Sequence, residues 1–280
     1  MDKMSLSEKI TYSTVLIRCL YENGTSGSGT GFIIHLCPNN GQCVPVIITN
    51  YHVVKDSVKT EFEICLKNDD GSPNDKEALR IDIQDNCWIH HPSHNIDLCC
   101  LPIADILNNL EKTSKKLFYI PLTTSLIASN DSLNNWVALE EVIMVGYPQG
   151  ISDEYNHKPI IRKGITATHL KNDYQGNKTF LVDMACFPGS SGSPIFILNE
   201  GIYKNDEGYP CVGNRIQFIG ILFQGPQYTA QGNLIFSNIP NIPTPVTQIP
   251  MNLGEAIKAE EILAFEKLFI QDINRETNNG

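Results

Sequence analysis

Ser191 lies in a turn whose composition suits nucleophilic chemistry, the segment FPGSSGSP at 187–194. The glycines on both sides allow the backbone to turn sharply and leave amide N–H groups pointing outward. A serine hydroxyl becomes a nucleophile only beside a general base, and its attack on a carbonyl creates an oxyanion that needs hydrogen-bond donors. The same composition is also typical of a flexible surface turn. The turn therefore indicates catalysis only if the rest of the chain supplies a base and an orienting acid.

Two other segments supply these groups. His52 follows the β-branched run VIIT at 46–49, so a strand end can hold its imidazole beside a cleft. Asp97 opens the apolar run DLCCL at 97–101, where a buried carboxylate needs a partner. A histidine ring N–H would satisfy it and fix the tautomer whose other nitrogen takes the serine proton. The order His52, Asp97, Ser191 is that of chymotrypsin and differs from the orders of subtilisins and α/β-hydrolases.

The chain resembles the trypsin-like serine proteases of chymotrypsin fold, in their bacterial, intracellular form. The resemblance spans roughly residues 10–250 and rests on GSGTGF (27–32), TNYHVV (49–54), Asp97-Leu98 and GSSGSP (189–194), with GYP (146–148) and RKGI (162–165) in support. The form of the histidine motif is closest to HtrA-like protease domains. We expect no PDZ domain, because the residues after Ser191 are too few to complete the protease and add one.

The resemblance implies an all-β fold of two six-stranded antiparallel β-barrels with a C-terminal α-helix. Residues 1–115 would form the barrel that carries His52 and Asp97, and 116–250 the barrel that carries Ser191. Residues 251–280 would form the helix and a polar tail. The implied activity is endopeptidase cleavage through an acyl-enzyme, with the oxyanion held by the N–H groups of Gly189 and Ser191 and with no metal or organic cofactor.

Short β-prone segments separated by turn residues agree with a barrel or sandwich. The join between the barrels is expected within 104–132, where 104–116 has the pattern of an inserted helix or loop. Apolar residues at helical intervals predict an amphipathic helix within 251–270, packed on the second barrel. The predicted strands are 14–19, 31–36, 46–49, 59–66, 81–83, 97–102, 141–145, 158–169, 179–184, 193–198 and 215–223.

Two departures from secreted relatives concern activation and specificity. Ser190 stands where those zymogens have the Asp that pairs with a new N-terminus, so control is expected from expression, loop ordering or an activating protein partner. Ala185 stands six positions before the nucleophile, where trypsin has its specificity carboxylate, so a strict Arg/Lys preference is not expected. Leu222, Phe223, Gln224 and Gly225 match the strand that pairs with substrate and predict an apolar or small pocket.

Composition excludes several other classes. With 41% hydrophobic and 19% charged residues the chain is typical of a globular protein with a sizeable core. The net charge of −10 argues against nucleic acid or an anionic membrane as the main partner. No apolar run approaches the ~18 residues that cross a bilayer. Polar residues fill 1–9, where a signal peptide would be apolar, so we expect a cytoplasmic protein that acts on proteins or peptides.

The cysteines and histidines leave alternatives open. Nine cysteines without a secretory signal predict mainly free thiols, although Cys37 and Cys43 flank a turn and could pair under oxidising conditions. His90, His91 and His94 suggest a metal site, but Pro92 and polar neighbours favour a solvated loop. The same triad could also serve an esterase, and a pseudoprotease that only binds proteins is a further alternative.

Overall fold

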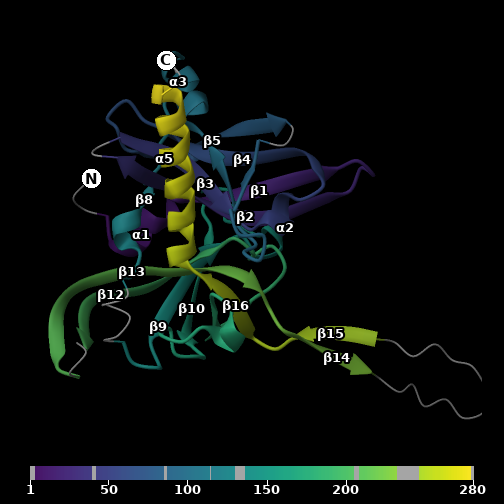
Figure 1. Ribbon diagram of the computed structural model, residues 1–280, viewed down its shortest axis with the longest axis vertical. Helices are drawn as coiled ribbons and strands as arrows, with labels where there is room; N and C mark the ends of the chain where they lie inside the picture. The colour runs from purple at the N-terminus through teal and green to yellow at the C-terminus, as the bar shows by residue number, and fades with distance from the viewer. Residues whose placement is uncertain are drawn as a thin grey trace, which may run out of the picture.

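The computed structural model describes residues 4–39, 42–84, 87–113, 115–129, 136–204, 208–231 and 246–278. Two β units follow one another along the chain, and a long C-terminal helix crosses the first of them (Figure 1). No helix among these residues is both long and apolar enough to cross a membrane.

The first unit is an eight-stranded sheet in the order β5-β4-β1-β2-β3-β7-β6, with β8 paired in parallel to β2. Three helices accompany it: α1 (Leu6–Thr11), α2 (Tyr51–Val54) and α3 (Ala104–Glu111). α1 begins with a capping box between Ser5 and Glu8. The strands are β1 (Thr14–Tyr21), β2 (Ser26–Asn39), β3 (Gln42–Thr49), β4 (Ser57–Lys67), β5 (Pro73–Gln84), β6 (Ile89–His90), β7 (Cys99–Pro102) and β8 (Leu122–Thr123).

The prediction of two closed six-stranded barrels is wrong for this unit. Among the described strands, the end strands β5 and β6 are not paired with each other, so the sheet stays open. β6 contains two residues, and Pro92 follows soon after with no N–H to donate to a continuing ladder. An edge this short cannot pair along the twelve residues of β5.

The second unit is a closed barrel of six strands in the order β10-β11-β16-β13-β12-β9. Its interior is filled by alternating apolar residues such as Val142, Met144, Phe180 and Val182. A separate hairpin, β14 (Gln227–Gln231) with β15 (Val246–Pro250), extends away from the barrel (Figure 1). The barrel strands are β9 (Glu141–Gly146), β10 (Ile160–Thr166), β11 (Thr179–Asp183), β12 (Pro194–Lys204), β13 (Pro210–Gln224) and β16 (Leu253–Lys258).

The C-terminal region differs from its prediction in two ways. Residues 253–258 form β16, because its residues pair with β11 on one side and β13 on the other to close the barrel. The turn η4 (Ala259–Ile262) follows, and the predicted C-terminal helix is α5 (Leu263–Asn278), which continues through the stretch expected to be a polar tail. α5 packs along β2 of the first sheet, and its Phe265 shares a core with Phe32 and with Phe218 of the barrel. The helix therefore packs on the first sheet in addition to the second barrel, where it was expected.

Most other predicted elements are confirmed. Each predicted strand segment contains a strand, and 104–116 contains α3. Three further single turns of 3₁₀ helix are present, η1 (Thr124–Leu126), η2 (Pro148–Gly150) and η3 (Tyr174–Gly176). Cys43 is disulfide-bonded, while the side chain of Cys37 lies outside the described residues. The described free thiols are Cys19, Cys65, Cys87, Cys99, Cys100, Cys186 and Cys211.

Candidate active site

The three predicted catalytic residues line one cavity between the open sheet and the barrel. His52 and Asp97 come from the first unit and Ser191 comes from the turn before β12. The volume of the cavity is about 540 Å³. Its lining is His52, Asp97, Cys186, Phe187, Pro188, Ser191, Leu222, Phe223, Gln224 and Gly225.

Strand register places Asp97 beside His52. β3 and β7 run antiparallel with Thr49 opposite Cys99, so the chain segments just beyond these residues lie together. The backbone N–H of His52 donates to Asp97 Oδ1 at 3.0 Å, and His52 Nδ1 is hydrogen-bonded to Asp97 Oδ2. Asn50 Nδ2 donates to the Asp97 carbonyl at 2.9 Å. These bonds fix the imidazole by Nδ1 and leave Nε2 without a partner among the described residues.

Ser191 is held in a resting orientation. Its Oγ donates to the carbonyl of Phe223 at 3.3 Å, and no hydrogen bond to His52 is present among the described residues. The ring centroids of His52 and Phe223 lie 6.1 Å apart in an edge-to-face contact. Catalytic hydrogen bonds are often long or absent without substrate and form in the complex. The Ser191 hydroxyl is therefore directed to the Phe223 carbonyl and not to His52.

Two backbone amides in the turn are oriented by the carbonyl groups of their own peptides. The Pro188 carbonyl accepts a hydrogen bond from Gln149 N at 2.6 Å, and the Ser190 carbonyl accepts one from Ser193 N at 3.0 Å. The C=O and N–H of a trans peptide point in opposite directions. The N–H groups of Gly189 and Ser191 are thus turned away from these partners, and neither has an acceptor among the described residues. They are suitable donors for an oxyanion.

The turn requires glycine at 189 and 192. Both residues have positive φ, 85° at Gly189 and 87° at Gly192, a region that L side chains rarely occupy. A Cβ on Gly189 would lie 2.7 Å from Gln149 N, and one on Gly192 would lie 1.9 Å from the Thr30 carbonyl oxygen. The turn is therefore packed tightly against both units.

Thr30 is a positioning residue that the sequence analysis did not single out. Its Oγ1 donates to the Gly189 carbonyl at 3.0 Å and accepts from Tyr147 N at 2.9 Å. Its backbone N–H donates to the Ser191 carbonyl at 2.9 Å, and the residue is fully buried. The signal that could have identified it is the GSGTGF motif, which contains Thr30 and for which no role had been assigned. Thr30 joins strand β2 to the turn that carries Ser191.

The predicted specificity residues are partly brought together. Leu222, Phe223, Gln224 and Gly225 line the cavity, whereas Ala185 does not; its carbonyl accepts a hydrogen bond from Arg162 Nη1 at 3.1 Å. Cys186, Phe187 and Pro188 line it in addition. Burial raises the pKa of the Cys186 thiol to about 12, against a smaller lowering by Arg162. Asp97 is the only carboxylate among the described residues that line the cavity. The wall formed by Cys186, Leu222 and Phe223 is apolar.

The histidine cluster before Asp97 is not a single solvated loop. His90 and His94 are exposed as expected, but His91 is buried at 4% exposure. Its Nδ1 accepts from Ser93 N at 3.1 Å, and its Nε2 bonds to the Glu261 carbonyl at 3.1 Å next to α5. Within the described residues, no three His, Cys, Asp or Glu side chains gather as metal ligands do.

Comparison with known proteins identifies a family. The family model of the trypsin-like peptidase domain matches residues 29–201, more than half of the chain. No curated protein sequence matches the chain.

Three solved structures similar to the chain are each 15% identical to it. The Rv3671c protease from M. tuberculosis in its active form has a TM-score of 0.45, with 91% of this chain and 79% of that chain covered. The MamO protease domain from Magnetospirillum magneticum has a TM-score of 0.46, with 93% and 98% covered. The serine endoprotease from Yersinia pestis has a TM-score of 0.46, with 94% and 65% covered.

Proposed function

Because the chain belongs to the trypsin-like peptidase family, a family of serine endopeptidases, we propose that it cleaves peptide bonds with His52, Asp97 and Ser191 as its catalytic triad. The observation that carries the assignment is the cavity that all three line, with His52 anchored through Nδ1 to Asp97. An imidazole held this way presents Nε2 as a base to the nearby hydroxyl.

The reaction proceeds in two acyl-transfer steps. His52 takes the Ser191 proton as Oγ attacks the scissile carbonyl, and the anionic Asp97 stabilises the imidazolium that forms. His52 then gives this proton to the leaving amine, and the acyl group remains esterified to Ser191. A water molecule attacks the ester with His52 again as base, which releases the acid and restores the serine.

The oxyanion of each tetrahedral intermediate is bound by the N–H groups of Gly189 and Ser191. Support comes from the bonds of the Pro188 and Ser190 carbonyls, which orient both donors before substrate arrives. Donors that need no reorganisation stabilise developing charge most effectively, and loss of one costs about 10²–10³ in kcat in other enzymes.

The substrate binds with an apolar or small side chain at the cleavage position. Cys186, Leu222 and Phe223 provide apolar walls, and Gly225 leaves room for the substrate backbone. A Lys or Arg side chain would lose its hydration there without gaining a carboxylate other than Asp97, which already holds His52.

Labelling with a fluorophosphonate probe and digestion of a peptide library test this function. The wild type is expected to label and to cleave after apolar or small residues. Ser191→Ala should abolish labelling, and Ser191→Ala or His52→Ala should lower turnover by roughly a millionfold. Ser190→Ala is the matched control, because its buried Oγ has no hydrogen-bond partner in the structure.

Near-normal proteolysis by Ser191→Ala or His52→Ala would refute the role assignment. Labelling with hydrolysis of esters but of no peptide in the library would favour the esterase alternative. Absence of labelling in the wild type under conditions where it is folded would favour a binding protein.

A further inference from the structure

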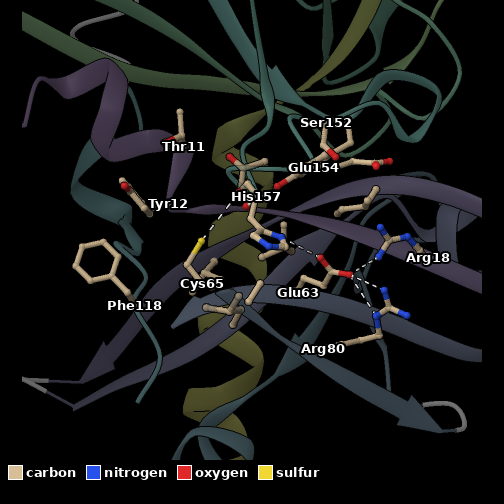
Figure 2. A pocket seen from close by; sticks show the side chains of 17 residues that line it. Thr11, Tyr12, Arg18, Glu63, Cys65, Arg80, Phe118, Ser152, Glu154 and His157 are labelled. Carbon is tan, nitrogen blue, oxygen red and sulfur yellow. Dashed lines mark hydrogen bonds and ion pairs between the residues drawn. The ribbon is translucent and has the colours of Figure 1, made fainter. Parts of the chain in front are cut away.

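A second cavity lies on the open side of the first sheet (Figure 2). Its volume is about 330 Å³, and it shares no lining residue with the catalytic cavity. One wall is formed by strands β1, β4 and β5, and the other by the loop that runs from Tyr147 to His157. The loop from the barrel lies over this face of the sheet and encloses the space.

The cavity has an apolar end and a charged end. Figure 2 shows Phe118, Tyr12 and Cys65 on one side, Arg18 and Arg80 on the other, and His157 between them. Leu16, Ile33 and Ile64 are further apolar residues of the lining. At the Phe118 side, the Tyr12 hydroxyl donates to Asp75, and Lys158 Nζ lies over the Tyr12 ring. A ligand that fills both ends must therefore combine an apolar body with a polar group.

Glu63 provides the open hydrogen-bonding position at the charged end. Its Oε1 accepts three bonds, from Arg18 Nη1 at 2.7 Å and from Arg80 Nη2 and Nε at 2.9 and 3.2 Å. Glu61 lies 3.6 and 3.5 Å from the same two arginines, so two carboxylates balance their charges. Burial raises the pKa of Glu63, but the arginines outweigh it and keep the pKa below its ordinary value.

The other oxygen of Glu63 forms a long ion-pair contact with His157 (Figure 2). Oε2 lies 3.7 Å from His157 Nδ1, longer than the 2.7–3.2 Å of a hydrogen bond. A group with several N–H donors can bond to both atoms at once, as an ammonium does. Glu154 adds a further carboxylate to the lining, whereas an anion would meet arginines that already have partners.

We propose that this cavity binds a small primary ammonium compound, with the ammonium bound by Glu63 and His157 and an apolar body directed toward Phe118. The contacts of the covering loop make the site regulatory. Gln149 in the same loop donates to the Pro188 carbonyl, the bond that orients the Gly189 amide. His157, at the other end, has a positive φ of 50°, a conformation costly to an L-residue without further support.

A bound ammonium would link His157 to β4 through Glu63 and restrict the loop in the conformation that orients Gly189. We therefore expect occupancy to raise kcat for peptide substrates. The expected rise in kcat rests on the proposed protease function, whereas the proposed binding of an ammonium compound does not. The two are measured separately.

Binding is tested on the Ser191→Ala protein by calorimetry, with phenethylamine as the ammonium probe and 3-phenylpropionate as its carboxylate counterpart. Phenethylamine should saturate in the millimolar range usual for so small a ligand, and 3-phenylpropionate should not bind. Glu63→Gln should weaken phenethylamine at least tenfold. Ala78→Leu should block the cavity, since Ala78 lines it without joining the charged network.

Glu77→Gln is the matched control, because Glu77 directly precedes Ala78 on β5 but is exposed and does not line the cavity. It should bind phenethylamine as the parent protein does. Three results would overturn the proposed site. The two probes could bind equally well, phenethylamine could bind Glu63→Gln and Ala78→Leu as tightly as it binds the parent protein, or its binding could fail to saturate.

The activity arm uses the protein with Ser191 intact. Saturating phenethylamine should raise kcat about fivefold or more, within the usual range of coupling between sites. Ala78→Leu should keep basal activity and lose the response. If phenethylamine binds but kcat does not change, only the regulatory role is overturned. If the wild type binds phenethylamine but has no peptidase activity, only the proposed function is refuted.

Discussion

Asp97 uses both carboxylate oxygens on a single residue, one for the backbone N–H of His52 and one for its ring. An amide at this position can still accept from the backbone, but its NH₂ group cannot accept from the ring N–H. The wrong imidazole tautomer would then face Ser191. Geometry would be preserved while the base is lost.

We expect Asp97→Asn to lower kcat by about 10⁴, with little change in the thermal midpoint. Steady-state hydrolysis of the best library peptide measures this, and far-ultraviolet circular dichroism monitors the fold. A loss of less than tenfold in a correctly folded variant would show that His52 does not depend on the carboxylate.

Cys186 is a second residue whose chemistry can be tested. Its buried thiol forms part of the apolar wall of the catalytic cavity. A thiol with a pKa near 12 is almost entirely protonated at neutral pH, and the thiolate is the reactive form. Iodoacetamide at pH 8 should therefore modify the exposed Cys87 first and leave Cys186 unmodified until the protein unfolds. Peptide mass spectrometry follows both sites, and equal rates would show that the thiol is accessible and ionised.

At the scale of elements, the turn before β12 depends on conformations that only glycine adopts easily. Gly189→Ala would combine a positive φ with a Cβ 2.7 Å from Gln149 N, so the turn must shift and the amide at 189 with it. We expect kcat to fall by about 10², the effect of losing one oxyanion donor.

Gly176→Ala provides the control for strain alone. Gly176 has a similar φ of 80°, but no atom lies within 4 Å of an added Cβ. Both variants should lose some thermal stability, measured by calorimetry, while only Gly189→Ala should lose turnover. Equal kcat values for the two would refute the assignment of the Gly189 amide.

The sequence predicted most strands, because β-branched runs and turn residues mark them locally. It failed at β16, where Ile257 stands at a helical interval from Phe265 but pairs with strands far away in the chain. The chain order and the motifs around His52, Asp97 and Ser191 predicted that these three residues lie together. They did not predict the resting bond of Ser191 to the Phe223 carbonyl or the absence of Ala185 from the cavity, because both depend on the backbone path between distant segments.

For the whole molecule, Thr30 is the point where the two units meet at the catalytic turn. Thr30→Val would keep the shape of the side chain but leave the Gly189 carbonyl and the Tyr147 amide without partners. Unsatisfied buried polar groups cost about 1–3 kcal/mol each, so we expect a fall of that order in the free energy of unfolding.

Activity of Thr30→Val should fall by about 10- to 100-fold, because a displaced oxyanion donor alone costs about 10²-fold. Thr30→Ser keeps the hydroxyl and should retain most activity. Urea unfolding and peptide hydrolysis are measured on both. A valine variant as active as the serine variant would show that Thr30 fills space only.

The division of the machinery between the units has a consequence for synthesis on the ribosome. The acid and the base are complete once the strands through Pro102 have emerged, but the alcohol comes much later and reaches its working position only when it docks on β2. From the roles proposed for His52, Asp97 and Ser191, we expect the nascent chain to carry no hydrolytic activity while its first half is folding. Neighbouring proteins are protected from it until the second half is made and joined to the first.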